Sequence, residues 1–304
     1  MKRINLQMFA AGDNNDLAVR NYQLEFKKLL QAVFKKQSYF SDFFGGDIEA
    51  LDGVQENDVA FYVKTSDIPV VIGTGYDTSA SKAFGAGTGN STRFGTRTEI
   101  IYENTAVRYS WGWSFHEGID RYSVNNNFES AVADRLELQA RAKTQKFNAQ
   151  HGAFISESAG KTETLTDYTA DNVLALFNAL SKYYNNIEAV GTRKAKVNSD
   201  LYNAIVDHPL MTSAKGSAAN IDENGIVKFK GFIIEEVPDG LFQSGECCYV
   251  YIAGVGKAFT GITTARTIES EDFDGRALQG AGKAGEYILP DNKKAVVKVT
   301  ISAA

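Results

Sequence analysis

Cysteine and histidine are scarce in this 304-residue sequence, which limits the chemistry that it can support. The only two cysteines, Cys247 and Cys248, are adjacent, and a mutual disulfide would require a strained ring, so a disulfide framework is excluded. The three histidines, His116, His151 and His208, are far apart in the sequence and offer too few ligands for a structural zinc site. We therefore expect no metal or other cofactor, and nothing points to secretion.

Long apolar runs and long basic runs are also missing. No segment approaches the roughly 18 to 20 apolar residues that a bilayer crossing needs. The apolar stretch near the N-terminus is interrupted by Asn5 and Gln7 and is too short for a signal peptide. With 32 Lys and Arg against 37 Asp and Glu, the net charge is −5, which argues against a protein that coats nucleic acid along its surface. We expect an intracellular, water-soluble protein with no membrane partner, which would meet DNA only as its container.

Sequence patterns typical of catalytic or ligand-binding loops are incomplete. Gly256-Lys257 and Gly282-Lys283 are each followed by alanine, so neither supplies the hydroxyl that binds magnesium in a P-loop. If Gly275 is set at the sixth position of a calcium loop, Ala281 falls where the bidentate glutamate should be. The two cysteines lie in an apolar strand pattern, which favours buried structural thiols over a nucleophile. We therefore expect that the protein is not an enzyme.

The first third of the chain predicts an amphipathic helix and a long hairpin arm. Residues 16–36 carry apolar side chains at helical spacing, and residues 1–36 hold seven basic and three acidic side chains, a net charge of +4. Extended segments at 59–63 and 68–72 face another at 99–113. Residues 73–95 between them are rich in Gly, Ser and Thr, so we expect a flexible tip. A two-stranded arm is marginally stable alone and needs a neighbour to lie on.

The rest of the chain predicts helices followed by strands. One long helix is expected over 129–150, at least about 30 Å long, then helices over 171–184, capped by Thr169 or Asp171, and over 199–207. Strands are expected at 226–230, 232–237, 247–253, 263–268 and 295–301. Aromatic residues alternate at strand spacing from Tyr109 to Phe115, and we expect them to pack the hairpin base against the long helix. Without regular βαβ alternation, this order predicts a mixed α+β fold.

Four short segments together carry a family resemblance. Residues 4–10 (Ile-Asn-Leu-Gln-Met-Phe-Ala) resemble the start common in phage structural proteins of Gram-positive hosts. Residues 197–202 and 229–238 together resemble a run of three elements: a helix, a strand with glycine, and a strand that ends near proline. Residues 251–259 resemble the strand and turn that follow this run. In their order and spacing these segments resemble the major capsid proteins of tailed bacteriophages with the Hong Kong 97 (HK97) fold.

The resemblance implies a domain organisation and a set of partners. The implied parts are an N-terminal arm (1–45), an E-loop hairpin with its base (46–112), a P-domain with a spine helix (113–165), an A-domain (166–258), a return to the P-domain (259–291) and a final A-domain strand (292–304). It also implies a non-enzymatic subunit that self-assembles into hexamers and pentamers, in a virion capsid built in the bacterial host cytoplasm. The partners implied are a portal protein, packaged double-stranded DNA bound without sequence specificity and, because only about 45 residues precede the arm, a separate scaffolding protein.

Subunit contacts are expected at three places along the chain. The expected residues are Phe26, Leu29, Leu30 and Val33, which dock the N-terminal arm; Lys82, Phe84 and Arg93, in a tip that lies over an adjacent subunit; and Trp111 and Trp113, which anchor the base of the hairpin. Some members of this family join subunits by a Lys–Asn bond, but no Asn and Glu can be matched to Lys64 or Lys82 here, so no cross-linking residues are assigned. Two alternatives stay open: an encapsulin-like nanocompartment around cargo enzymes, and a phage tail-tube or adhesin-like β protein, against which the helix at 129–150 argues.

Overall fold

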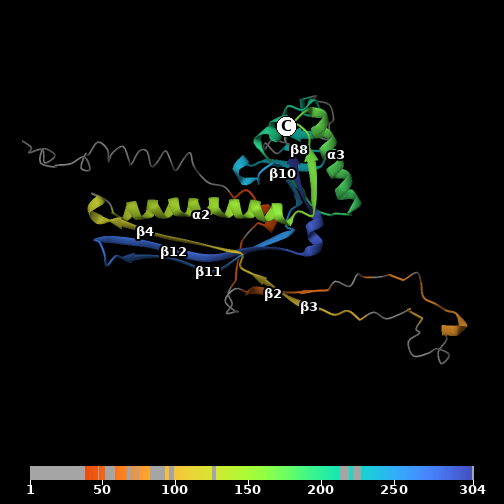
Figure 1. Ribbon diagram of the computed structural model, residues 1–304, viewed down its shortest axis with the longest axis horizontal. Helices are drawn as coiled ribbons and strands as arrows, with labels where there is room; N and C mark the ends of the chain where they lie inside the picture. The colour runs from red at the N-terminus through yellow and green to blue at the C-terminus, as the bar shows by residue number, and fades with distance from the viewer. Residues whose placement is uncertain are drawn as a thin grey trace, which may run out of the picture.

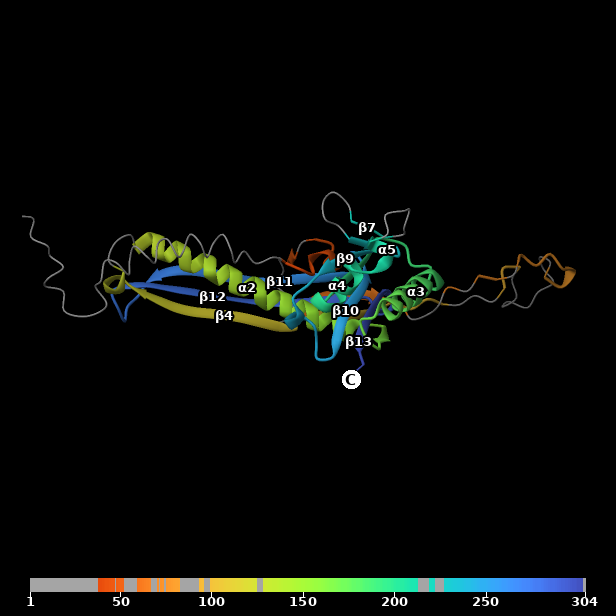
Figure 2. The same ribbon diagram turned by 90° about the horizontal axis from the view of Figure 1, so that it is seen from above.

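Three parts of different shape make up the computed structural model (Figures 1 and 2). It describes residues 38–46, 48–51, 59–66, 70, 72–73, 75–82, 93–95, 99–124, 128–212, 219–221 and 227–302. We call the three parts the compact unit (the described residues of 161–252 and 296–301), the long sheet (β4, β11 and β12, with α2 along it) and the hairpin (β2, β3 and the described residues between them). In both views the hairpin and the far end of the long sheet project in opposite directions from the compact unit.

The compact unit is a mixed seven-stranded sheet with helices on one face. In sheet order its strands are β5 (Lys161–Leu165), β13 (Val296–Ile301), β10 (Glu246–Ile252), β6 (Arg193–Val197), β9 (Phe232–Glu236), β8 (Val227–Phe229) and β7 (Ala219–Ile221). The pairs β5–β13 and β6–β9 are parallel and the other pairs are antiparallel. Three helices connect strands of this sheet. Helix α3 (Ala170–Asn186) comes between β5 and β6 in the sequence, and α4 (Ser199–Val206) and the short α5 (Pro209–Thr212) come between β6 and β7.

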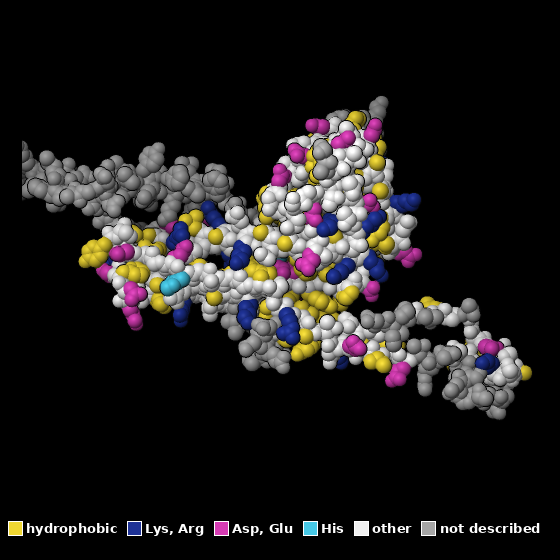
Figure 3. Space-filling view, viewed as in Figure 1, with side chains coloured by type: hydrophobic (Ala, Val, Ile, Leu, Met, Phe, Trp, Pro, Cys, Tyr) yellow, Lys and Arg dark blue, Asp and Glu magenta, His cyan; other side chains and the backbone are white. Residues whose placement is uncertain are grey.

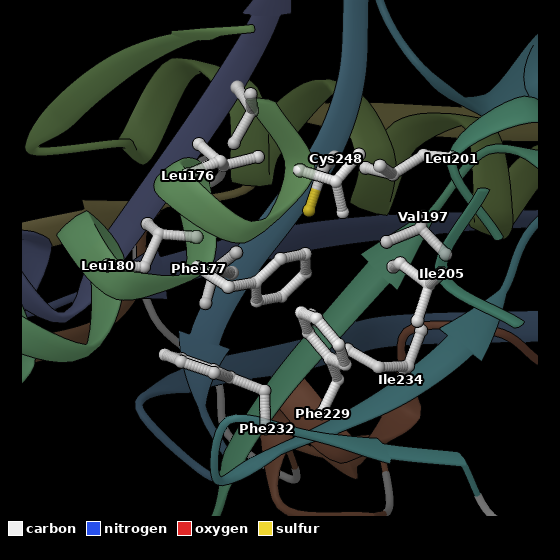
Figure 4. Close-up of a cluster of buried hydrophobic side chains, with 14 of the residues drawn as sticks. Leu176, Phe177, Leu180, Val197, Leu201, Ile205, Phe229, Phe232, Ile234 and Cys248 are labelled. Carbon is white, nitrogen blue, oxygen red and sulfur yellow. The ribbon is translucent and has the colours of Figure 1, made fainter. Parts of the chain in front are cut away.

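The core of the compact unit forms because α3 and α4 bury apolar residues at helical spacing against the sheet (Figure 4). Phe177 of α3 lies edge-on to Phe229 and Phe232, with ring centroids 5.1 and 5.7 Å apart. The Asn198 side chain caps α4 by accepting a hydrogen bond from the Leu201 N–H (3.0 Å). The helix predicted over 171–184 is confirmed, and Thr169 occupies its N-cap position as predicted, although its hydroxyl donates to Asp167 and makes no cap hydrogen bond.

The long sheet is built from three strands that run side by side, with a fourth, very short one at its edge. Its order is β1 (Glu49–Ala50), β11 (Gly256–Glu269), β12 (Gly275–Ile288) and β4 (Trp111–Asp120). Aromatic rings from the outer strands lie directly on glycines of β12. A Cβ added at Gly280 or Gly282 would stand 2.2 Å from the Phe115 ring or 2.7 Å from the Trp113 ring. These glycines let large side chains lie flat on the sheet.

Helix α2 (Phe128–Ser158) lies along the long sheet and is eight residues longer at its C-terminal end than the predicted 129–150 helix. Its first half is polar and is held by side chains, with Arg135 and Gln139 both hydrogen bonded to Glu117 of β4. Its second half buries one face, which includes Phe147, His151 and Ile155, against the long sheet and the compact unit. None of the helices within the described ranges is long and apolar enough to cross a membrane.

The strand expected over 99–113 is two strands with different partners, which corrects the predicted hairpin. β3 (Glu103–Arg108) pairs with β2 (Val59–Thr65), whereas β4 begins at Trp111 and pairs with β12. The chain changes partner at residues 109 and 110, where Ser110 N–H donates to the Ala284 carbonyl (3.0 Å). The strand expected over 68–72 is wrong at residues 70 and 72, which belong to no strand, and the rest of it lies outside the described residues. Strands β5, β6 and β12 had not been predicted.

The close approach of α2 to the compact unit predicts the effect of one substitution. In Gly152→Ala the added Cβ would lie 2.4 Å from the Leu241 carbonyl oxygen, so the backbone must shift. We expect a loss of about 1–3 kcal/mol in the free energy of unfolding, measured by urea denaturation. Gly240→Ala, one residue from Leu241 but facing open space, is the matched control and should change stability by less than about 0.5 kcal/mol. Equal effects of the two substitutions would contradict this packing.

Candidate assembly surfaces and the joint between them

The hairpin carries apolar side chains that the rest of the chain leaves exposed. Val70, Ile72 and Phe94 are 88%, 90% and 87% exposed. Further exposed apolar residues on the same part are Tyr62, Tyr76, Ile100, Ile101 and Tyr102. Figure 3 shows apolar side chains spaced along the hairpin and gathered where it meets the long sheet. Apolar surface on this scale is typical of a site that another molecule covers.

The far end of the hairpin is held together by local contacts. Asp77 N–H donates to the Arg93 carbonyl (2.9 Å), the Arg93 guanidinium lies 5.9 Å from the Tyr76 ring centroid, and the Tyr76 and Phe94 rings are 5.0 Å apart. Lys82 ends a short 3-10 helix, Ala80–Lys82. Of the predicted tip residues, Lys82 and Arg93 are thus at this end, and Phe84 is outside the described residues. So are the predicted arm residues Phe26, Leu29, Leu30 and Val33.

The base of the hairpin is fixed to the long sheet by a small aromatic cluster. Phe61 of β2 lies edge-on to Phe259 of β11 (5.2 Å between centroids) and to Tyr287 of β12 (6.0 Å). Val107 of β3 is buried in the same cluster. The sequence reasoning did not single out these residues, because the cluster joins strands about 200 positions apart in the sequence.

Trp111 and Trp113 lie on β4 and face α2. The Trp111 and Phe147 rings are 4.7 Å apart, and the Lys143 ammonium lies 4.3 Å from the Trp113 ring centroid. Burial lowers the pKa of Lys143. The expected packing on the long helix is confirmed for Trp111 and Trp113, whereas Tyr109 lies against Phe259 of β11, with 5.7 Å between ring centroids. The contact of Trp111 and Trp113 with another subunit stays a prediction.

A short segment just before the hairpin joins the compact unit to α2 and the long sheet. It contains the 3-10 helix η3 (Ser41–Phe44), and we call residues 38–46 the wedge. Phe40, Phe43 and Phe44 are buried within the cluster that these parts share. Phe43 lies edge-on to Tyr251 of β10 at 4.9 Å, and Phe44 lies 4.5 Å from the His151 ring of α2. The aromatic density at 39–44 could have been noticed in the sequence, but not its partners.

Charged groups on the face of the compact sheet opposite α3 and α4 also hold the wedge. The Tyr251 hydroxyl donates to Asp42 Oδ1 (2.8 Å), and the ammonium groups of Lys194 and Lys196 lie 3.2 and 3.1 Å from Oδ2. Both lysines also bind Glu235. Burial acts to lower the pKa of Lys194, but the two carboxylates outweigh it and hold the pKa above its ordinary value. Two positive and two negative charges thus balance where the wedge meets the sheet.

The C-terminal end of α2 has its own polar attachment to the compact unit. Glu246 of β10 accepts hydrogen bonds from Ser156 (2.7 Å) and Tyr249 (2.6 Å), and the Lys298 ammonium lies 3.0 Å away. Burial acts to raise the pKa of Glu246, but these partners outweigh it, so the pKa is below its ordinary value. The carboxylate is therefore ionised at neutral pH.

The two cysteines and the acidic turn after β11 were the other candidates for a chemical role, and the contacts of both are structural. Cys247 and Cys248 are fully buried, and burial raises the pKa of Cys247 to about 12, so the predicted structural thiols are confirmed. The acidic turn after β11 is bound by arginines, with Arg121 on Glu269 and Asp274 at 3.4 and 3.0 Å. Within the described residues, no three His, Cys, Asp or Glu side chains gather as metal ligands would.

Comparison with solved structures identifies the fold. The capsid of cyanophage P-SCSP1u is similar at 11% identity and a TM-score of 0.62, covering 90% of each chain. The mature capsid of bacteriophage PhiM1 is similar at 10% identity and a TM-score of 0.62, covering 89% of each. A virus-like particle from Pyrococcus furiosus gives 14% identity and a TM-score of 0.50, covering 91% of this chain and 98% of its own. No family model and no curated protein matches. The chain therefore has the HK97-like α+β fold of phage capsid proteins, as predicted.

One Phe→Ala substitution in the wedge and one in the hairpin should differ strongly in their effect on the free energy of unfolding. Phe43→Ala removes a fully buried ring and should lower the free energy of unfolding by about 3–5 kcal/mol. Phe94→Ala removes a ring that is 87% exposed and should change it by less than about 0.5 kcal/mol. Urea denaturation of the unassembled subunit measures both. A small effect at Phe43 would show that the wedge does not hold the parts together.

Proposed function

We propose that this chain is the shell subunit of an icosahedral bacteriophage head, which self-assembles into hexamers and pentamers and encloses double-stranded DNA. The observation that carries the proposal is the structural similarity to phage capsid chains. It covers about nine tenths of this chain and about nine tenths of each capsid chain. The exposed apolar hairpin supports it independently, because such a surface requires a covering partner. The role is structural and not catalytic.

In this proposal the hairpin is the part that reaches a neighbouring copy. A surface that binds a different patch on the next copy is heterologous, and repeated rotation of such contacts closes a ring. The hairpin and its base correspond to the E-loop, the long sheet with α2 to the P-domain, and the compact unit to the A-domain. Lys82, Phe84 and Arg93 would lie over the adjacent subunit, and residues 1–45 would form the N-terminal arm.

Electrostatics favours packaged DNA that touches the shell without sequence specificity. The chain has a net charge of −5, so a shell built from it does not attract DNA over its whole inner surface. A portal protein would admit the DNA, and a separate scaffolding protein would set the curvature during assembly. The site of action would be the virion, after assembly in the host cytoplasm.

A compartment that encloses cargo enzymes is the second candidate. The observation that favours it is the similarity to the virus-like particle from Pyrococcus furiosus. The two functions differ in what purified particles contain, since a head holds DNA and a compartment holds protein. The tail-tube or adhesin-like alternative is not supported by the 31-residue helix α2 or by the fold match.

Electron microscopy of the purified protein tests the proposal. We expect closed shells or rings when the chain is expressed alone or with a scaffolding protein encoded beside it. Nuclease-protected DNA in particles from infected cells would support the head, and a co-purifying enzyme would support the compartment. A strictly monomeric protein in both preparations would contradict both functions.

Substitutions on the hairpin should separate folding from assembly. The double variant Ile72→Ser, Phe94→Ser removes apolar surface that makes no core contact, so the melting temperature of the subunit should be unchanged while the yield of shells falls at least tenfold. Val190→Ser, at a residue that is 93% exposed on the compact unit, is the control and should assemble normally. Deletion of residues 76–92 should likewise leave a folded subunit that closes no shells. Normal shells from these hairpin variants would disprove the role of the hairpin.

A further inference from the structure

A buried histidine of α2 faces a buried glutamate of the long sheet. His151 Nε2 lies 3.6 Å from Glu286 Oε1, and the two side chains are only 2% and 3% exposed. Neither ring nitrogen of His151 has a hydrogen-bond partner in the described structure. Because a buried polar atom without a partner is costly, this pair calls for an explanation that packing alone does not give.

The groups around the pair are aromatic or neutral. The His151 ring lies 4.5 Å from the Phe44 ring of the wedge and 5.7 Å from the Phe147 ring of α2. Glu286 accepts hydrogen bonds from the Trp111 indole (2.9 Å to Oε1) and the Ser110 hydroxyl (3.1 Å to Oε2). Both donors come from the chain at the start of β4.

The lysines on the elements that pack around Glu286 either contact other groups or are exposed. Lys143 of α2 lies over the Trp113 ring, and Lys146 donates to the Gly112 carbonyl (3.1 Å). On β11, Lys257 is exposed. On the wedge, the charge of Asp42 is directed to the lysines of β6. Within the described ranges none of these cations forms an ion pair with Glu286, so an ionised Glu286 would be a buried charge with hydrogen bonds but no countercharge.

The pKa values of the two buried carboxyl groups beside α2 are therefore shifted in opposite directions. Glu246, with Lys298 beside it, has a lowered pKa. Burial raises the pKa of Glu286, and the hydrogen bonds from Trp111 and Ser110 offset only part of that effect. Burial lowers the pKa of His151 to about 4, so its imidazole is neutral and one ring nitrogen is free to accept a hydrogen bond.

We propose that Glu286 is held as a carboxylic acid that donates its proton to Nε2 of His151, so that a neutral, pH-sensitive pair joins α2 to the long sheet. A shift of about 0.5–0.9 Å brings the two atoms to hydrogen-bonding distance. When the pH rises, the O–H bond breaks, the proton passes to solvent, and a carboxylate remains with its two donors while the imidazole loses its partner. The device is internal to one subunit and does not depend on the proposed shell.

The sign of the pH dependence follows from the raised pKa. Between the ordinary glutamate pKa of 4.5 and its higher value in the fold, the folded chain binds more of this proton than the unfolded chain. The contribution of Glu286 is thus fully present below 4.5 and is lost as the pH rises through the folded pKa. His151 has the opposite sign below 6.5, because it charges only when the chain unfolds. Comparing variants isolates the glutamate.

Thermal melting of the full-length subunit from pH 4.5 to 9 tests the pair. Glu286→Gln is neutral at every pH and can still accept from Trp111, so its melting temperature relative to wild type should rise with pH and then level off. Glu246→Gln is the matched control with the opposite sign: it should lower the melting temperature most at neutral pH and less in acid. A pH-independent effect of Glu286→Gln would overturn the proposal.

The Trp111 indole reports the ionisation directly, because its N–H is bonded to Glu286. The chain has two tryptophans, so Trp113→Phe assigns the two indole resonances in a ¹⁵N spectrum. We expect the Trp111 resonance to titrate with a midpoint above 4.5, in the wild type and in Glu246→Gln but not in Glu286→Gln. A midpoint at or below 4.5, or no titration, would disprove the neutral acid.

The role of the histidine has a separate test. His151→Leu removes the acceptor, so the midpoint should fall, and His151→Gln, whose amide oxygen can accept, should restore it. An unchanged midpoint in His151→Leu would show that burial alone raises the pKa, and the pairing would be wrong. If His151→Leu does not fold, a His151→Gln midpoint that falls to 4.5 or below overturns the pairing in the same way.

Discussion

The burial of three phenylalanines of the wedge, Phe40, Phe43 and Phe44, is the contact on which the arrangement of the parts depends. Each fully buried ring contributes on the order of 1.5–3 kcal/mol, and together they contact β10 of the compact unit, α2 and the start of β11. The fit is close, since a Cβ added at Gly256 would stand 2.3 Å from the Phe43 ring. The hydrophobic effect supplies the energy here, and the balanced charges around Asp42 fix the direction in which the segment enters.

Local patterns were enough to predict the helices and most strands of the compact unit. The apolar stripe of α3 and the proline after α4 are properties of consecutive residues, and the structure has those helices where they were expected. These elements bury one face against a sheet, and spacing alone reveals that face.

Elements that depend on contacts with residues far away in the sequence were not predicted, or were predicted with the wrong bounds. β12 is rich in glycine and alanine, which local propensity disfavours in a strand, yet the glycines are required by rings on β4 and β11. The end of α2 passes through Gly152 because the Leu241 carbonyl occupies the space of a side chain. The division between β3 and β4 depends on a change of partner strand at Ser110, which the sequence of this segment alone does not reveal. The buried pair of His151 and Glu286 joins positions 135 residues apart, so no motif could reveal it.

The short strand β1 sits between the wedge and the hairpin, and its position has a consequence for how the parts are joined. Its two residues pair with Phe259 and Thr260 of β11, and Phe259 also holds the base of the hairpin from the other side. The base of the hairpin therefore meets the long sheet at Phe259 and Tyr287, and the wedge, a few residues before β1, meets the compact unit. Phe259 is thus the residue that the hairpin base, the long sheet and the strand next to the wedge have in common.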